Sequence, residues 1–115
     1  YEEEYGQAPG VFNAQAYDAT AVLLLANVAA GDNDGLAIRD QMRTVANPGG
    51  MEVGPDNLAE GIATVAGGEA VNYQGASSPV TFDENGDVVA VTYSIWQFGD
   101  GGAIEEIETI DFSAE

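Results

Sequence analysis

The sequence predicts an α/β protein in which about three helices are followed by an antiparallel β-hairpin or three short strands. Three observations predict this class. Between residues 11 and 66, apolar side chains recur at helical spacing, and turns rich in glycine and proline separate the runs. After residue 79, the spacing changes to the alternation that is typical of strands. The 115 residues suffice for one domain and not for two.

The longest apolar run, residues 11–30, predicts a helix that is mostly buried. Few polar side chains interrupt the run, and its apolar residues lie nearly all round the helix. Gly31 follows as a residue suited to the left-handed conformation that ends many helices. Without a larger sheet to cover it, such a helix exposes a large apolar patch. We therefore expect the chain to repack or to self-associate.

Two further helices are predicted, one over residues 35–46 and one from Pro55 to the Gly67–Gly68 pair. Asp34 or a neighbour can cap the first of them, and Pro55 is suited to the first turn of the other. The apolar face of the first is formed by Ile38, Met42 and Val45. The order of elements is therefore helices first and antiparallel strands after them.

Three strands are expected after the helices: Val80–Phe82, Val88–Phe98 and Ile104–Phe112. Asn85–Gly86 is a strong signal for a two-residue hairpin turn because both residues tolerate a positive φ. Glutamates are mixed into the last strand, which suits an edge where charge discourages further pairing.

The charge of the chain is extreme. Its 20 acidic residues face only Arg39 and Arg43, and with no Lys or His the formal net charge is -18. Self-repulsion at this density destabilises a compact state unless ions screen it. We therefore expect a halophilic protein; the alternative is an acidic protein without that adaptation. Nucleic acid is not expected as a partner, because phosphate binding requires Lys and Arg, and anionic membrane surfaces are disfavoured for the same reason.

Side chains that usually carry catalysis are scarce. The chain has no Cys and no His, so the commonest nucleophiles and bases are missing. Asp83, Asn85 and Asp87 have the first spacing of an EF-hand loop, but Val88 and Ser94 stand where that loop needs Gly and Glu. The favoured interpretation is a hairpin turn. We expect no catalytic residue, no metal site and no cofactor, and therefore no enzyme.

Three segments resemble, in order and spacing, the branched-chain amino-acid (Leu/Ile/Val) binding proteins of ABC importers. They are Phe12–Ala19 with its Tyr-Asp-Ala sequence, Asn72–Asp87 and Tyr93–Phe98. The resemblance runs from Tyr1 onward and corresponds to the last third of such a protein. It implies a partial type I periplasmic-binding-protein fold and a chain that is the C-terminal segment of a larger protein.

In that family, two α/β lobes joined by three crossing strands close around a small ligand. The resemblance implies that residues 1–78 are the helical part of the first lobe. Residues 79–115 would carry the last hinge crossing, over Pro79–Asp87, and the C-terminal antiparallel strands. The groups that grip the ammonium and carboxylate of an amino acid would lie upstream. We therefore expect this segment alone to bind ligand weakly or not at all.

Phe12 is the one candidate ligand-binding residue. From the residues alone, core packing at the start of the helix is the favoured interpretation. The resemblance instead places Phe12 where the family has an aromatic ring that faces the side chain of the ligand. An apolar ring can bury an aliphatic side chain there.

The resemblance implies an extracytoplasmic solute-binding protein, at the cell surface or in the periplasm, whose signal sequence lies outside this chain. It would capture an amino acid or similar small molecule by hinged closure and deliver it to an ABC permease. Two alternatives remain. One is a ligand-sensing domain of a receptor with the same fold, and the other is a stand-alone acidic structural domain.

Overall fold

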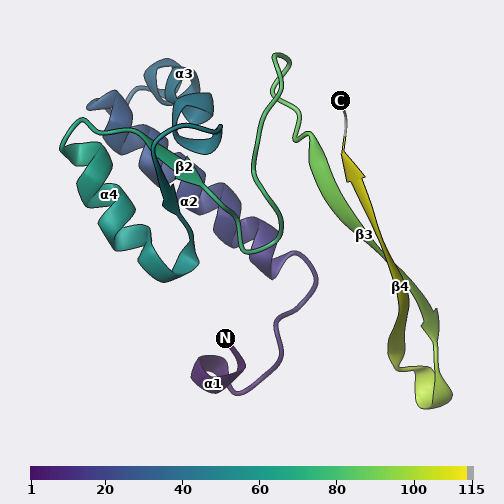
Figure 1. Cartoon of the computed structure of the whole chain (residues 1–115). Helices are drawn as coiled ribbons and strands as arrows, with labels where there is room; N and C mark the ends of the chain where they lie inside the picture. The colour runs from purple at the N-terminus through teal and green to yellow at the C-terminus, as the bar shows by residue number, and fades with distance from the viewer. Residues whose placement is uncertain (114–115) are drawn as a thin grey trace.

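The structure, a computed structural model, describes residues 1–113 and consists of a helical body and a β-ribbon that projects from it (Figure 1). The elements in chain order are α1 (Glu2–Tyr5), α2 (Asn13–Ala30), α3 (Gly35–Ala46), β1 (Met51–Val53), a 3-10 turn (Pro55–Asn57), α4 (Leu58–Ala66), β2 (Val71–Tyr73), β3 (Ala90–Phe98), a second 3-10 turn (Asp100–Gly102) and β4 (Ile104–Ser113). The predicted α/β class is confirmed.

The boundaries of α3 are those that the sequence predicts. The carboxylate of Asp34 accepts hydrogen bonds from the backbone N–H groups of Leu36 (3.0 Å) and Ala37 (3.1 Å), so Asp34 is the N-cap. α2 ends at Gly31, whose φ of 64° is left-handed as expected. Among the described residues no single helix is both long and apolar enough to cross a membrane; α2 and α3 meet that test only as a pair bent by 109°.

Two short strands lie among the helices, which corrects the expected order of helices first and strands afterwards. β1 and β2 are parallel, with Met51 opposite Val71 and Val53 opposite Tyr73. A parallel pair requires a crossover connection, and α4 provides it. α4 packs tightly on β1, because a Cβ atom on Gly61 would lie 2.4 Å from the Val53 side chain.

α2 turns one face to the core and another to solvent. Its core face, at most 1% exposed, consists of Ala21, Val22, Leu25 and Ala26. This face belongs to one core with Val45 of α3 and Val65 of α4. On the outer face, Leu23 and Leu24 are 49% and 47% exposed. The prediction of a mostly buried helix is therefore wrong for the described residues, because α3 and α4 cover only one side.

β3 and β4 form the antiparallel ribbon (Figure 1), with Tyr93 opposite Ile110 and a register shift between Ile95 and Trp96. The shift marks a β-bulge. Large apolar side chains of the ribbon are exposed: Tyr93, Ile95, Trp96, Phe98, Ile104, Ile107, Ile110 and Phe112. A two-stranded ribbon alone is only marginally stable, so this surface is one that further protein would stabilise.

The turn before β3 lies where the sequence predicts it but is longer than a two-residue hairpin. The carboxylate of Asp83 accepts hydrogen bonds from the backbone N–H groups of Asn85, Gly86 and Asp87 at 2.8 to 2.9 Å. Of the two residues expected to have a positive φ, only Gly86 has one, at 95°. Residues 80–82 form a single bridge, between Phe82 and Val88, and not the predicted strand. The side chain of Asp83 therefore organises this turn.

Candidate functional site

Phe12 lies at the N-cap of α2 in a left-handed conformation, with φ 68° and ψ 5°. It is the only non-glycine residue in the described part of the chain with a positive φ. Its side chain is 71% exposed, so the expectation of core packing is wrong. A bulky residue rarely adopts this conformation, and such outliers concentrate at functional sites.

A hollow of about 580 Å³ lies at the same end of α2. Its walls include Tyr1, Tyr5, Asn13, Tyr17, Pro55 and Ala76. The Asn13 amide donates a hydrogen bond of 2.7 Å to the Tyr1 hydroxyl, and the rings of Tyr1 and Tyr5 are 4.6 Å apart. Phe12 is not among the lining residues. The hollow has the size of small-molecule pockets, which range from about 300 to 1,000 Å³.

In the first half of α2, the carboxylate of Asp18 forms hydrogen bonds that attach the helix to the loop following β2. Asp18 is only 3% exposed. It accepts hydrogen bonds from the Tyr73 hydroxyl (2.8 Å), the Ala76 N–H (2.7 Å), the Ser77 N–H (2.8 Å) and the Ser77 hydroxyl (2.5 Å). We call this group of residues the Asp18 clasp. A Cβ atom on Gly75 would lie 2.5 Å from the carboxylate, so the close approach of the loop requires glycine.

The clasp fixes the protonation of its two titratable members. Burial raises the pKa of Asp18, but the hydrogen bonds from Ser77, Ala76 and Tyr73 outweigh burial and hold that pKa below its ordinary value of 3.8. Burial, together with the hydrogen bond to Asp18 and its charge, raises the pKa of Tyr73. At neutral pH Asp18 is charged and Tyr73 is protonated. Because the carboxylate is saturated with donors, it can anchor the loop but is not free to act as a base.

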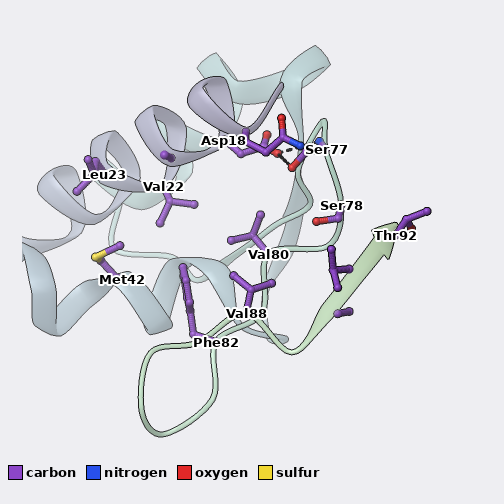
Figure 2. A pocket seen from close by; sticks show the side chains of 14 residues that line it. Asp18, Val22, Leu23, Met42, Ser77, Ser78, Val80, Phe82, Val88 and Thr92 are labelled. Atoms are coloured by element: carbon purple, nitrogen blue, oxygen red, sulfur yellow. Dashed lines mark hydrogen bonds between the residues drawn. The ribbon is translucent and has the colours of Figure 1, made fainter. Parts of the chain in front are cut away.

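A second hollow, of about 490 Å³, lies between α2, the 77–82 segment and the start of β3 (Figure 2). Its walls are mainly apolar, and the labelled apolar side chains are Val22, Leu23, Met42, Val80, Phe82 and Val88. The hydrogen-bonded pair of Asp18 and Ser77 stands at one end (Figure 2). This hollow can hold apolar groups and offers polar contacts only at its edge.

Asp18, Tyr73 and Ser77 are not among the site residues predicted from the sequence. One signal was available, because Asp18 is the only acidic residue in the 18-residue α2. A single carboxylate in an apolar helix must be either exposed or satisfied by donors from elsewhere. Its donors are 55 to 59 residues further along the chain, and their identity depends on the fold.

Comparison with known proteins gives one match. The protein-family model described as "Receptor family ligand binding region" matches residues 1–101, which is most of the chain. No curated protein and no solved structure matches the chain significantly. The family is a ligand-binding, non-enzymatic domain type that is typically extracellular or periplasmic and binds small molecules.

The helices and short strands agree with this assignment, because they are consistent with a partial type I periplasmic-binding-protein fold. The chain thus belongs to the receptor family ligand binding region, a family of periplasmic-binding-protein type I-like ligand-binding domains.

Proposed function

We propose that the chain is the C-terminal part of an extracytoplasmic solute-binding protein that captures an amino acid or similar small molecule for an ABC importer by hinged closure. The observation that carries the proposal is the family match over residues 1–101. The resemblance of three segments to Leu/Ile/Val-binding proteins supports branched-chain amino acids as the ligand class. An ABC permease is the proposed partner, and no catalytic step is proposed.

Phe12 is the proposed contact for the aliphatic side chain of the ligand. Its ring is exposed at the start of α2, and its backbone is held in a strained conformation. Burial of apolar surface between ring and ligand contributes about 25 cal/mol per Å². The ammonium and carboxylate groups would be gripped by other parts of the full-length protein.

Replacement of Phe12 by Ala in the full-length protein is expected to raise the Kd for leucine about tenfold, which corresponds to about 1.4 kcal/mol of lost contact. Isothermal titration calorimetry measures the change. Val11→Ala is the matched control, because Val11 is the adjacent apolar residue and is 78% exposed. Equal Kd values for the two variants would remove Phe12 from the site.

A receptor domain is the second candidate, because the description of the matching family names receptors. The two candidates differ in what the ligand-bound protein does. A transport protein should stimulate ATP hydrolysis by its reconstituted permease, whereas a sensor domain should bind the same ligand without that stimulation. The assay therefore distinguishes the two roles once a ligand has been identified.

We also propose adaptation to high salt, on the basis of the net charge of -18. Raising KCl from about 0.1 M to about 1 M shortens the Debye length from about 10 Å to about 3 Å. Screening should relieve repulsion among the carboxylates, so the midpoint of thermal unfolding should rise over this range. Sucrose, which is uncharged, serves as the control for general solute effects. A midpoint that falls, or that rises equally in sucrose, would contradict the proposal.

The outer face of α2 and the ribbon support a proposal of self-association in the absence of other protein. Leu23 and Leu24 are about half exposed, and both faces of the ribbon carry large apolar side chains. Exposed large apolar side chains in this number favour contact with another protein surface.

A further inference from the structure

We infer that α2 and α3 hold the segment that follows β2 against the helical body, and that the bend of the proposed closure falls after this segment, at Val88–Ala90. Arg43 and Asn47 are positioning residues for the segment, and we call these two residues the clamp. The inference rests on the proposed hinged closure. It refines the position of the last crossing, which the resemblance places over Pro79–Asp87.

The first attachment is the Asp18 clasp. Asp18 accepts hydrogen bonds from the backbone N–H groups of Ala76 (2.7 Å) and Ser77 (2.8 Å). Shortly after them, Val80 is 9% exposed and belongs to the apolar core. The segment at which the crossing begins is therefore fixed to the helical body both by backbone hydrogen bonds and by packing.

The second attachment comes from the C-terminal part of α3 and the residue after it. The Asn47 amide donates to the Phe82 carbonyl and accepts from the Phe82 N–H, both at 2.9 Å. It thus satisfies both backbone polar groups of Phe82, as a neighbouring strand would. Arg43 donates to the carbonyl oxygens of Asp83 (2.7 Å, from Nε) and Glu84 (2.8 Å, from an Nη).

The hydrogen bonds of Arg43 support the inference because the chain has very few cationic side chains. The chain has two cationic side chains against 20 carboxylates. Arg39 forms an ion pair of 2.6 Å with Asp40, next to it on α3. Arg43, one turn further along, instead donates hydrogen bonds from its planar guanidinium group to two uncharged carbonyl groups. The structure therefore uses one of its two positive charges to hold the backbone of residues 83 and 84.

The hydrogen bonds that attach the chain to the helical body end at the beginning of β3. The Val89 N–H donates to the Thr81 carbonyl at 3.0 Å, which is the last backbone hydrogen bond that connects this region to the preceding segment in the described residues. From Ala90 onward, the strand pairs with β4. Figure 1 shows the ribbon leaving the helical body at this point. Hinges are commonly a few residues at the end of an element, and Val88–Ala90 meet that description.

Two distances between spin labels test the position of the bend. The chain contains no cysteine, so introduced cysteines are labelled selectively. One pair, at positions 63 and 84, connects α4 to the clamped turn; the other, at positions 63 and 97, connects α4 to the ribbon. Double electron–electron resonance without ligand should give one narrow distribution for the first pair and a clearly broader one for the second. A first distribution as broad as the second would overturn the inference.

Variants of the clamp provide the second arm of the test. Arg43→Gln should add a broad component to the distance between positions 63 and 84, whereas Arg39→Gln, on the same helix, should not. Asn47→Asp is the second clamp variant: it keeps the acceptor for the Phe82 N–H and loses the donor to the Phe82 carbonyl. It should broaden the same distance, and circular dichroism checks that helix content is retained. Equal distributions for the Arg39 and Arg43 variants and the parent would overturn the role of Arg43.

Addition of leucine to the full-length protein, labelled at the same two pairs of positions, then separates this inference from the proposed function. Closure about Val88–Ala90 should shift the distance between positions 63 and 97 and leave that between positions 63 and 84 unchanged. A shift confined to the 63–84 distance would overturn the position of the bend. Unchanged distances would count against leucine as the ligand, while the ligand-free distributions would still decide where the bend lies.

Discussion

Replacement of Asp18 by Asn is expected to lower the free energy of unfolding by about 3 kcal/mol, because buried donors then lose a charged acceptor. The Asn side chain keeps one acceptor oxygen, but its NH₂ group replaces the other. The NH₂ group would then face donors of Tyr73, Ala76 or Ser77, which would be left without an acceptor. Urea denaturation at neutral pH measures the loss. Tyr73→Phe removes only one of the hydrogen bonds, so it should cost less, about 1 kcal/mol.

The cost of Asp18→Asn should depend on pH. The pKa of Asp18 is lower in the folded chain than its ordinary value of 3.8, so the stability it contributes is present above that value and is lost as the pH falls through the folded pKa. The pKa of Tyr73 is raised, so its contribution is present below its ordinary value of 10.0 and is lost as the pH rises through the folded pKa.

The difference in stability between the parent and Asp18→Asn isolates this effect. Repulsion among the other carboxylates also changes with pH, but it is largely common to both proteins and cancels in the difference. The difference should be constant between about pH 5 and about pH 8 and should shrink below about pH 4. A difference that is unchanged in acid would show that the charge of Asp18 does not hold the loop.

In the monomer, Leu25→Ala should lower the free energy of unfolding by about 2–5 kcal/mol, whereas Leu24→Ala should change it by no more than about 0.5 kcal/mol. The two leucines are neighbours on α2, but Leu25 is 0% exposed and Leu24 is 47% exposed. The substitution leaves a cavity only at Leu25. Urea denaturation of both variants provides the measurement and its matched control.

A large loss for Leu24→Ala would contradict the exposed state of the outer face of α2. Sedimentation velocity of the same samples would then show whether a second copy covers that face. A loss at Leu24 in a monomeric sample would mean that the outer face of α2 is covered within the chain itself.

Helices α2, α3 and α4 were predictable because their signals are local, whereas the four-residue α1 was not predicted. Asp34 caps α3, Gly31 ends α2, and Gly67 follows α4 directly, as the spacing of apolar and turn residues predicts. Such signals act within one or two turns of a helix, so the sequence alone contains them. β3 was predictable for a similar reason, because it is long enough to show alternation. β4 also lies where a strand is predicted, although its isoleucines recur at every third residue.

β1 and β2 were not predictable in the same way. Each has three residues, too few to show a period, and their pairing joins residues that are 20 apart in the chain. The turn at 83–87 was located correctly, but its form depends on the side chain of Asp83, which takes up three backbone donors. That competition between side chain and backbone was not considered in the two-residue hairpin prediction.

The candidate site was predictable only in part. The resemblance drew attention to Phe12, and the structure adds its exposure and its positive φ. The Asp18 clasp combines a helix with a loop more than 50 residues away, and the clamp formed by Arg43 and Asn47 spans 35 to 41 residues. Contacts of that range follow from the packing of α2 and α3, which no local pattern specifies.

The proposed function is tested most directly by a thermal-shift scan of the full-length protein in about 2 M KCl against a panel of amino acids, amides and small carboxylates. A ligand present at about 100 times its Kd should stabilise the protein by about 2.7 kcal/mol. We expect a selective rise of the unfolding midpoint with leucine, isoleucine or valine. An unfolding midpoint that does not change with leucine, isoleucine or valine would contradict the proposed ligand class, whether or not a compound of another class raises it.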